Sequence, residues 1–219
     1  LRDSVDLGFK PTKRTWGAEV FPGSSLPNAM VQVSPVTKFH SGAGYQYEDS
    51  VIYGFTHTNK GHWNLCHIPL LPVTGTPTPG DYCSPFSHER ESAAPGYYQV
   101  FLDRYGVDAQ LSSTLRCAFH KYTYPAGAAA SLLADLQRSN EHVRAWDIRK
   151  EGDNVFAGWQ QTGEKMYFYA VANRPVTGIE PVVEGDREVR IVRFGEGDGA
   201  LELRIGFSFV SEKNARENL

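Results

Sequence analysis

Residues 107–119, VDAQLSSTLRCAF, alternate between apolar and polar side chains. Apolar residues hold most of the odd positions, and the even positions carry Asp108, Gln110, Ser112, Thr114 and Arg116. This period of two predicts one long β-strand with a buried face and a solvated face. Cys117 falls on the predicted buried face, where a thiol behaves as a small apolar side chain. His120 follows on the predicted polar face.

A second alternating segment, ALELRIGFSFV, covers residues 200–210. Turns rich in Gly and Pro, such as TGTPTPGD and YPAG, separate other short apolar runs. Short strands with turn signals between them are typical of an antiparallel sandwich. The segment SLLADL, which starts at residue 131, fits a strand better than a helix because it lies between strands. We therefore predict an all-β antiparallel β-sandwich, with further strands at 29–33, 44–56, 67–73, 96–103, 142–149, 154–161, 165–172 and 187–194.

The composition indicates one folded domain. A chain of 219 residues fits one large β domain better than two small ones. Eleven Tyr, twelve Phe, 21 Gly and 13 Pro residues favour strands joined by turns. The net charge of −3, with both signs interspersed, provides no basic face, so we expect no nucleic-acid partner. No apolar run approaches the ~20 residues that a membrane helix needs, so we expect no membrane span.

The three cysteines are Cys66, Cys83 and Cys117, and an odd number leaves at least one free thiol. A disulfide between Cys66 and Cys83 stays open as an alternative. Near the C-terminal end, Ser211 has the side chain of a helix N-cap and Glu212 suits a first helical turn. We expect the sandwich to cover residues 1–210 and a linker helix to begin within 211–219.

The segment GHWNLCHIPLLP, residues 61–72, concentrates side chains that could carry chemistry. His62, Cys66 and His67 are possible metal ligands, but the second ligand pair of a structural zinc site is missing. Hydrogen bonds within a turn are the simpler interpretation. Cys66 and His67 do not predict a catalytic dyad, because neighbours in an extended chain point apart. We therefore predict no metal site here and no catalytic nucleophile.

Carboxylates offer no convincing acid–base pair for glycoside hydrolysis, which uses two of them across the scissile bond. Glu48 and Asp49 are consecutive in a predicted strand and should face opposite sides. Glu89 and Glu91 lie in the charged segment HERESAAPG, for which we expect exposure to solvent. We therefore expect no catalytic residue in this chain.

Two loop segments, KFHSGAGYQY and THTNKGHWN, mix aromatic rings with amides and imidazoles. Sugar sites combine apolar walls with a few polar groups, and Gly42, Gly44 and Gly61 allow backbone to approach a ligand. The composition is compatible with sugar binding, and a packed cluster of turns is the main alternative. The candidate residues are Phe39, His40, His57, Asn59, His62, Trp63 and Asn64.

Several long motifs resemble the N-terminal domain of glycoside hydrolase family 92, the exo-acting α-mannosidases. They are VFPGSSLPNAMVQVSPVT, GYQYEDSVIYGFTHT, SHERESAAPGYYQVFLDRYGVDAQLSSTLRCAFHKYTYP and IGFSFVSEKNAREN, in this order from about residue 17 onward. The resemblance implies a galactose-mutarotase-like β-supersandwich joined by helices to an (α/α)6 catalytic barrel. It also implies an inverting, calcium-dependent and exported enzyme. Its catalytic carboxylates and Ca²⁺ site would lie on that barrel, outside these residues.

The loop after His57 and Thr58 departs from the family pattern, as does the Phe39–His40 pair. We expect residues 57–64 to line a substrate pocket, with Trp63 stacked on a sugar ring and His62 and Asn64 bonded to hydroxyls. The rim would also include Phe21, Gly23, Phe39, His40 and His57. The expected partners are an α-mannoside or related glycan and the chain's own C-terminal barrel.

Two alternatives come from other classes. One is a stand-alone carbohydrate-binding module or lectin, which a short gene would favour. The other is a mutarotase-like enzyme, which needs a histidine and a glutamate converging in one pocket. Under the first hypothesis this chain alone is inactive, whereas the mutarotase would be complete.

Overall fold

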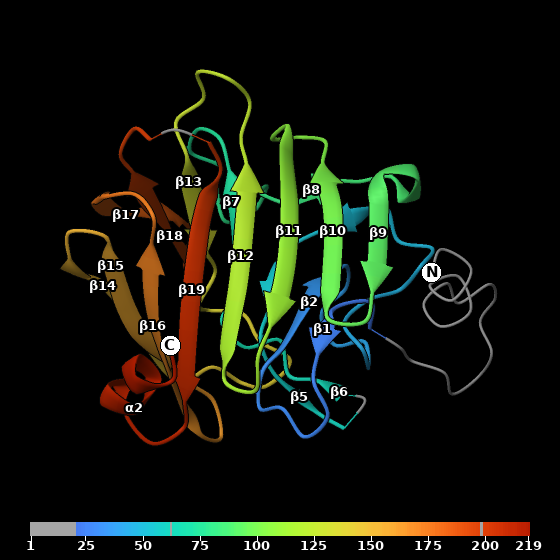
Figure 1. Ribbon diagram of the computed structural model, residues 1–219, viewed down its shortest axis with the longest axis vertical. Coiled ribbons are helices and arrows are strands. Elements are labelled where there is room, and N and C mark those ends of the chain that lie inside the picture. Colours follow the sequence, from blue (N-terminus) through green and yellow to red (C-terminus); the bar gives the residue numbers. More distant parts are fainter. Residues whose placement is uncertain (1–20, 62, 198) are drawn as a thin grey trace.

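The computed structural model describes residues 21–61, 63–197 and 199–219. Within these ranges two large antiparallel sheets stack face to face (Figure 1). The seven-stranded sheet has the spatial order β1 (Ser24–Ser25), β2 (Gln32–Val36), β4 (Gly54–Thr56), β7 (Leu70–Val73), β13 (Ser131–Ala134), β18 (Arg187–Phe194) and β17 (Val176–Glu184). The eight-stranded sheet has the order β14 (Ala145–Gly152), β15 (Val155–Gln161), β16 (Lys165–Ala172), β19 (Leu201–Ser208), β12 (Cys117–Thr123), β11 (Val107–Ser113), β10 (Tyr97–Leu102) and β9 (Glu91–Ala94).

Smaller elements complete the described part of the chain. Two short ribbons pair β3 (Val51–Ile52) with β8 (Ser84–Pro85) and β5 (Asn59–Lys60) with β6 (Trp63–Asn64). A 3-10 turn, η1, covers His88–Arg90, and the helix α2 covers Glu212–Glu217. As the sequence predicts, Ser211 caps α2, because its Oγ accepts a hydrogen bond from Asn214 N at 3.1 Å. None of the described helices has the length and apolar character needed to cross a bilayer.

The core lies between the two sheets. In β16 the residues at even positions are buried while those at odd positions are half-buried, so the strand turns one face inward. The inner faces of both sheets interdigitate in this way, as expected for stacked sheets. The largest fully buried side chains of the core include Phe55, Tyr98, Tyr122, Phe156, Phe168 and Phe207. The prediction of an all-β antiparallel sandwich is confirmed.

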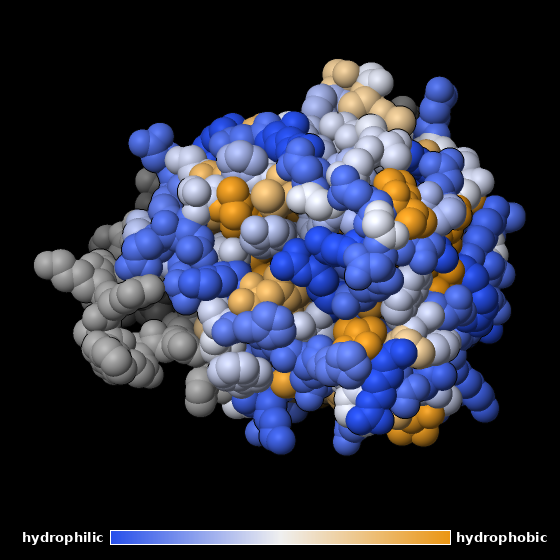
Figure 2. Space-filling model, turned by 180° about the vertical axis from the view of Figure 1, so that it is seen from behind, coloured by the Kyte–Doolittle hydropathy of each residue, from blue (hydrophilic) through white to orange (hydrophobic). Residues whose placement is uncertain are grey.

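The seven-stranded sheet is buried on both of its faces over four central strands. Every residue of β2, β4, β7 and β13 is buried. On the side away from the core, Val36, Phe39 and Cys66 form a small second apolar cluster with Tyr53 packed against it. Figure 2 shows this side of the molecule, where small hydrophobic areas are separated by hydrophilic side chains. Loops therefore cover the strands on this side, and the candidate site lies among those loops.

The prediction of a single strand over 107–119 is wrong. The segment is a hairpin, in which β11 ends at Ser113 and β12 begins at Cys117. Thr114 closes the turn, since its N–H donates to the Cys117 carbonyl at 2.8 Å and its Oγ1 accepts from Cys117 N at 3.2 Å. Leu115, predicted to be buried, is 52% exposed at the tip. The turn shifts the alternation, so His120 faces the core, not solvent, while Cys117 is buried on the outer face of its sheet.

Other expected strands are present with shifted bounds. The region 44–56 is a turn followed by the short strands β3 and β4, not one strand. Strand β17, the edge of its sheet, was not predicted because Pro181 and Gly178 interrupt its pattern; an edge strand tolerates proline. SLLADL does contain a strand, β13. All three cysteines are free thiols, so the Cys66–Cys83 disulfide does not form.

Candidate functional site

A pocket of about 490 Å³ opens among the loops that connect β2 with β3 and follow β13. Residues 37–40, which follow β2, and residues 48–51, which lead into β3, both line it. Arg138 reaches the pocket from a loop distant in sequence. The lining consists of Thr37, Lys38, Phe39, His40, Glu48, Asp49, Ser50, Val51, Tyr53 and Arg138.

Arg138 is held over aromatic rings. Its guanidinium carbon lies 4.1 Å from the centre of the Phe39 ring and 5.0 Å from that of Tyr53, within cation–π range. Its Nη1 donates to the Tyr82 hydroxyl at 3.3 Å, and that hydroxyl donates to Asp135 Oδ2 at 2.6 Å. Burial raises the pKa of Tyr82, so the hydroxyl keeps its proton. The guanidinium is therefore fixed at the pocket with most of its donors left for a ligand.

Two carboxylates, Glu48 and Asp49, also line the pocket. Asp49 Oδ2 accepts from Thr37 Oγ1 at 2.7 Å, and Thr37 Oγ1 in turn accepts from Gln46 N at 2.9 Å. Asp49 is half-buried, whereas Glu48 is exposed. These two residues precede β3 and do not lie in the strand that the sequence predicted, and both line the pocket. An aromatic wall, cationic donors and carboxylate acceptors together suit a polyhydroxylated ligand.

The structure brings only some of the expected site residues to this pocket. Phe39 and His40 line it, and His40 is exposed with a positive φ of 58°. Trp63 is 41% exposed on the β5–β6 ribbon, which packs beside the 40–44 loop through the hydrogen bond from Asn64 N to Gly42 O at 2.8 Å. His62 lies outside the described residues.

The remaining expected site residues have structural partners. His57 is fully buried in the core, with its Nε2 at 3.1 Å from His120 Nε2. Asn64 is buried, and its Oδ1 accepts from Cys66 N at 2.7 Å. Gly23 is buried against the backbone of β2. A Cβ at this position would lie 1.9 Å from Val33 O, so only glycine lets the two backbones come this close. Phe21 is half-buried at the start of the described chain. None of these four lines the pocket.

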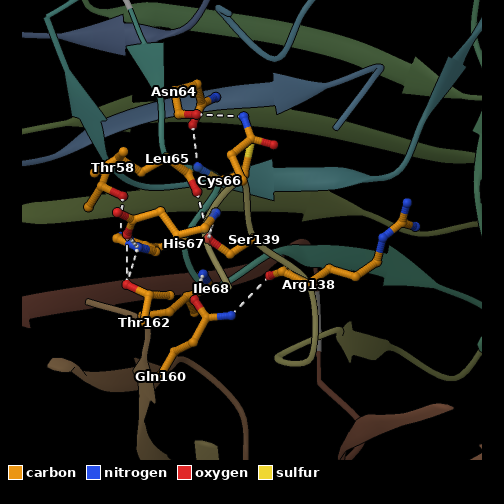
Figure 3. A network of polar contacts seen from close by, with 12 residues as sticks. Thr58, Asn64, Leu65, Cys66, His67, Ile68, Arg138, Ser139, Gln160 and Thr162 are labelled. Atoms are coloured by element: carbon orange, nitrogen blue, oxygen red, sulfur yellow. Dashed lines mark hydrogen bonds and ion pairs between the residues drawn. The ribbon is translucent and has the colours of Figure 1, made fainter. Parts of the chain in front are cut away.

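Beside the pocket, residues 64–68 follow a strained path. Cys66 and Ile68 have φ of 54° and 53°, and this region is unfavourable for a β-branched residue. Gln160 supports the turn, since its Oε1 accepts from Ile68 N at 2.8 Å. Its Nε2 donates to the Leu136 carbonyl at 3.0 Å and to the Arg138 carbonyl at 2.9 Å, and Figure 3 shows the contact with Arg138. One side chain therefore ties the strained turn to the main chain of the pocket arginine.

Asn140 connects the two expected loop segments. Its Oδ1 accepts from His40 N at 2.6 Å, and its Nδ2 donates to Asn64 O at 2.7 Å. His40 and Asn140 are 100 positions apart, so no local pattern could have predicted this bridge. The same holds for Arg138 and Tyr53, which sequence reasoning missed. Arg138 lies outside the quoted motifs, and its contact with Tyr53 forms only through the fold.

The side chains of His67 and Cys66 are buried and have structural roles. His67 Nδ1 lies 2.8 Å from Thr58 Oγ1, and His67 Nε2 lies 2.9 Å from Glu141 Oε2. Desolvation lowers the pKa of His67 although Glu141 opposes this, and burial raises the pKa of the Cys66 thiol to about 12. Across the described residues, no three His, Cys, Asp or Glu side chains converge on a common point.

Glu91 differs from the expectation of a solvated turn. Its side chain is only 9% exposed. It accepts hydrogen bonds from the hydroxyls of Tyr98, at 2.6 Å, and Tyr45, at 3.0 Å, and it contacts His88 Nδ1 at 2.5 Å. Glu89, two residues away, is exposed as predicted.

Comparison with known proteins places the chain in a family. The family model described as the glycosyl hydrolase family 92 N-terminal domain matches residues 10–214. A family GH92 α-mannosidase from Bacteroides thetaiotaomicron is similar in structure, with a TM-score of 0.82 and 25% identity, covering 91% of this chain and 32% of that one. The GH92 glycosyl hydrolase ccman5 gives a TM-score of 0.75 at 26% identity, covering 90% and 31%.

A third structure shares the fold. It is the family GH92 inverting mannosidase from Bacteroides thetaiotaomicron VPI-5482, with a TM-score of 0.79 and 22% identity, covering 94% of this chain and 31% of that one. A search of curated proteins gave no match. The present chain spans about a third of the length of these solved structures.

Proposed function

Since this chain belongs to glycosyl hydrolase family 92 as its N-terminal domain, we propose that its pocket binds part of an α-mannoside or related glycan. The observation that carries the proposal is the guanidinium of Arg138 stacked 4.1 Å from Phe39 in a pocket that also holds Glu48 and Asp49. The B. thetaiotaomicron α-mannosidase has also been solved with mannoimidazole. Support therefore comes from both the family and the side chains present.

The polar groups of the pocket match the needs of a sugar. Hydroxyls donate to the carboxylates of Glu48 and Asp49 and accept from Arg138 and Lys38. The rings of Phe39 and Tyr53 line the pocket and give it an apolar surface, which a pyranose face requires. Trp63, exposed on the adjoining ribbon, would contact a longer glycan in this proposal.

Hydrolysis itself belongs, in this proposal, to the rest of the protein. The solved relatives are about three times as long as this chain, which leaves room for a C-terminal catalytic barrel that carries the acid, the base and the Ca²⁺ ligands. The whole protein would be an inverting, exported α-mannosidase. In this proposal the sandwich forms one side of its substrate pocket.

A second candidate function has one specific observation in its favour. His40 and Glu48 both line the pocket, and a histidine–glutamate pair in one pocket is what an aldose mutarotase needs for proton transfer. Polarimetry of freshly dissolved α-D-mannose with this chain distinguishes the two. Faster mutarotation that disappears in the Glu48→Gln variant supports the mutarotase function. A mutarotation rate that the protein leaves unchanged excludes it.

The main proposal is tested by binding. Titration with methyl α-D-mannoside, followed by amide chemical shifts, should perturb residues 37–40 and 48–53 in the wild type. Arg138→Ala should weaken binding roughly tenfold, because it removes charged hydrogen-bond donors. Arg116→Ala, at the exposed tip of the β11–β12 hairpin, is the matched control and should bind as the wild type does. Equal affinity in the Arg138 variant would contradict the proposed site.

A further inference from the structure

Asp135 follows β13 and carries a buried carboxylate that does not line the pocket. Its side chain is only 1% exposed. Its Oδ2 accepts a hydrogen bond from the Tyr82 hydroxyl at 2.6 Å and another from Nη2 of Arg187, on β18, at 3.0 Å. Its main-chain N–H donates to the Pro69 carbonyl at 3.1 Å. Burial of a carboxylate is costly unless the carboxylate is paired, and these contacts both pair Asp135 and fix its position.

Tyr82 connects this carboxylate to the pocket. A tyrosine hydroxyl has one hydrogen, and Tyr82 donates it to Asp135 Oδ2. Its oxygen is therefore left as an acceptor, and Arg138 Nη1 donates to it at 3.3 Å. The Tyr82 ring meets the Tyr53 ring edge-on with centres 6.2 Å apart, and the Tyr82 carbonyl accepts from the Tyr105 hydroxyl at 2.6 Å. These contacts hold the residue in place, and Asp135 sets the direction in which its hydroxyl points.

We propose that Asp135 is a positioning residue for glycan binding, which acts through the Tyr82 hydroxyl to orient the guanidinium of Arg138 at the pocket. The inference rests on the proposed function. Without an acceptor at Asp135, the Tyr82 hydrogen is free to rotate toward Arg138, where one donor would face another. Arg138 would keep its stacking on Phe39 and Tyr53. Stacking does not fix the direction of the N–H groups within the guanidinium plane, so the donors would no longer be aligned for a ligand.

The main chain of Arg138 is held by other contacts. Its carbonyl accepts from Gln160 Nε2 at 2.9 Å, and its N–H donates to the Asp135 carbonyl at 3.2 Å. Figure 3 shows the Arg138 side chain extending away from the Gln160 contact. Neither contact uses the Tyr82 hydroxyl or the Asp135 carboxylate. Loss of the hydroxyl should therefore disturb the guanidinium and leave the Arg138 backbone in place, which separates positioning from a general loss of structure.

The test measures ligand affinity and the state of the Arg138 side chain in this chain labelled for NMR. Titration with methyl α-D-mannoside gives the dissociation constant, and the Nε–Hε signal of Arg138 reports the surroundings of its guanidinium. Tyr82→Phe removes the hydroxyl and keeps the ring. Asp135→Leu removes the acceptor, whereas Asp135→Asn keeps an oxygen that can accept from Tyr82. Tyr124→Phe is the matched control, because this hydroxyl donates to the Ser131 carbonyl and does not line the pocket.

Tyr82→Phe and Asp135→Leu should each weaken mannoside binding roughly fivefold, the effect of about one hydrogen bond, and should shift the Nε–Hε signal of Arg138. The loss should be smaller than in Arg138→Ala, because the guanidinium is still present. Asp135→Asn and Tyr124→Phe should bind within about twofold of the wild type. Amide exchange at Arg138 should be unchanged in Tyr82→Phe.

Wild-type affinity in Tyr82→Phe overturns the inference, and so does faster amide exchange at Arg138 in that variant. Equal losses in Asp135→Asn and Asp135→Leu also overturn it, since they would assign the effect to charge. If Asp135→Leu does not fold, Tyr82→Phe and Asp135→Asn decide. If the wild type binds no mannoside, the proposed function fails instead. The Arg138 signal then decides the inference alone, and an Nε–Hε signal that is the same in Tyr82→Phe and the wild type overturns it.

Discussion

At the scale of single residues, the buried pair His57 and His120 makes stability depend on pH. Desolvation lowers the pKa of His57 to about 3 and that of His120 well below its usual range. In the unfolded chain both rings have pKa values near ~6.5. Between these limits the unfolded state therefore binds protons that the folded state rejects. The stabilisation is complete above pH ~6.5 and is lost as the pH falls below it.

We expect the free energy of unfolding to fall by up to ~1.4 kcal/mol per pH unit for each of the two histidines as pH drops from ~6.5 to ~5. Urea unfolding at several pH values measures this slope. His142→Gln, which removes an exposed histidine, should leave the slope unchanged. A flat profile over this interval would show that the pair is not buried as described.

Trp63 offers a second test on one side chain. Its ring is 41% exposed and is not part of the core, so Trp63→Ala should leave the melting temperature within about a degree or two of the wild type. If the ring stacks on substrate, kcat/KM of the whole protein on an α-linked mannoside should fall roughly tenfold. Steady-state kinetics beside a thermal melt separates the two effects. Near wild-type turnover would assign the ribbon a structural role only.

At the scale of elements, helix α2 depends on a glycine in the sheet beneath it. A Cβ on Gly206 would lie 2.1 Å from the Ala215 carbonyl oxygen, so only glycine lets the helix backbone approach β19. Gly206→Ala should therefore displace α2 and lower the free energy of unfolding by about 1–3 kcal/mol. Urea unfolding and amide exchange of Glu212–Glu217 measure both effects.

Gly163→Ala is the matched control, because a Cβ there meets no heavy atom within 4 Å. It should leave the amide protection of α2 unchanged. If Gly206→Ala gives the same result, the helix is not seated against the sheet as described.

Elements were predictable where the side-chain period was unbroken. Strands β15, β16 and β18 have nearly the predicted bounds, because each alternates regularly between clear turns. The hairpin at 107–123 was misread because Leu115, in its turn, keeps the odd-position spacing and hides the reversal. The 44–56 region was misread because residues 44–50 carry strand-forming tyrosines but are held as a turn by Thr37 and His88.

At the scale of the whole molecule, the site was only partly predictable. Phe39 and His40 were found because aromatic and imidazole groups in a glycine-rich loop stand out locally. Arg138 and Tyr53 were missed because their neighbours in space are far away in sequence. His57 and Asn64 were expected in the pocket because polar residues in loops suggest ligands, but the fold uses them inside the protein. Sequence patterns report chemistry, whereas burial decides whether a ligand can reach it.

The whole chain should not hydrolyse α-mannosides alone. We expect no release of nitrophenol from p-nitrophenyl α-D-mannoside above the buffer rate, because the proposed acid, base and Ca²⁺ site lie outside these residues. A discontinuous assay at high protein concentration checks this. Turnover that is abolished by Glu48→Gln would place hydrolytic chemistry in the sandwich and contradict the proposed division of labour.

The strand order also divides the molecule into two halves that never interleave. In one sheet β1, β2, β4 and β7 lie beside β13, β18 and β17, and in the other β9–β12 lie beside β14–β16 and β19. The chain crosses this seam once, through the turn at residues 124–130, and each half holds part of both sheets. Cleavage in that turn would yield two fragments able to reassemble along β7–β13 and β12–β19 as a split protein. Since Arg138 alone comes to the pocket from the second fragment, recovery of ligand binding would report their reassembly.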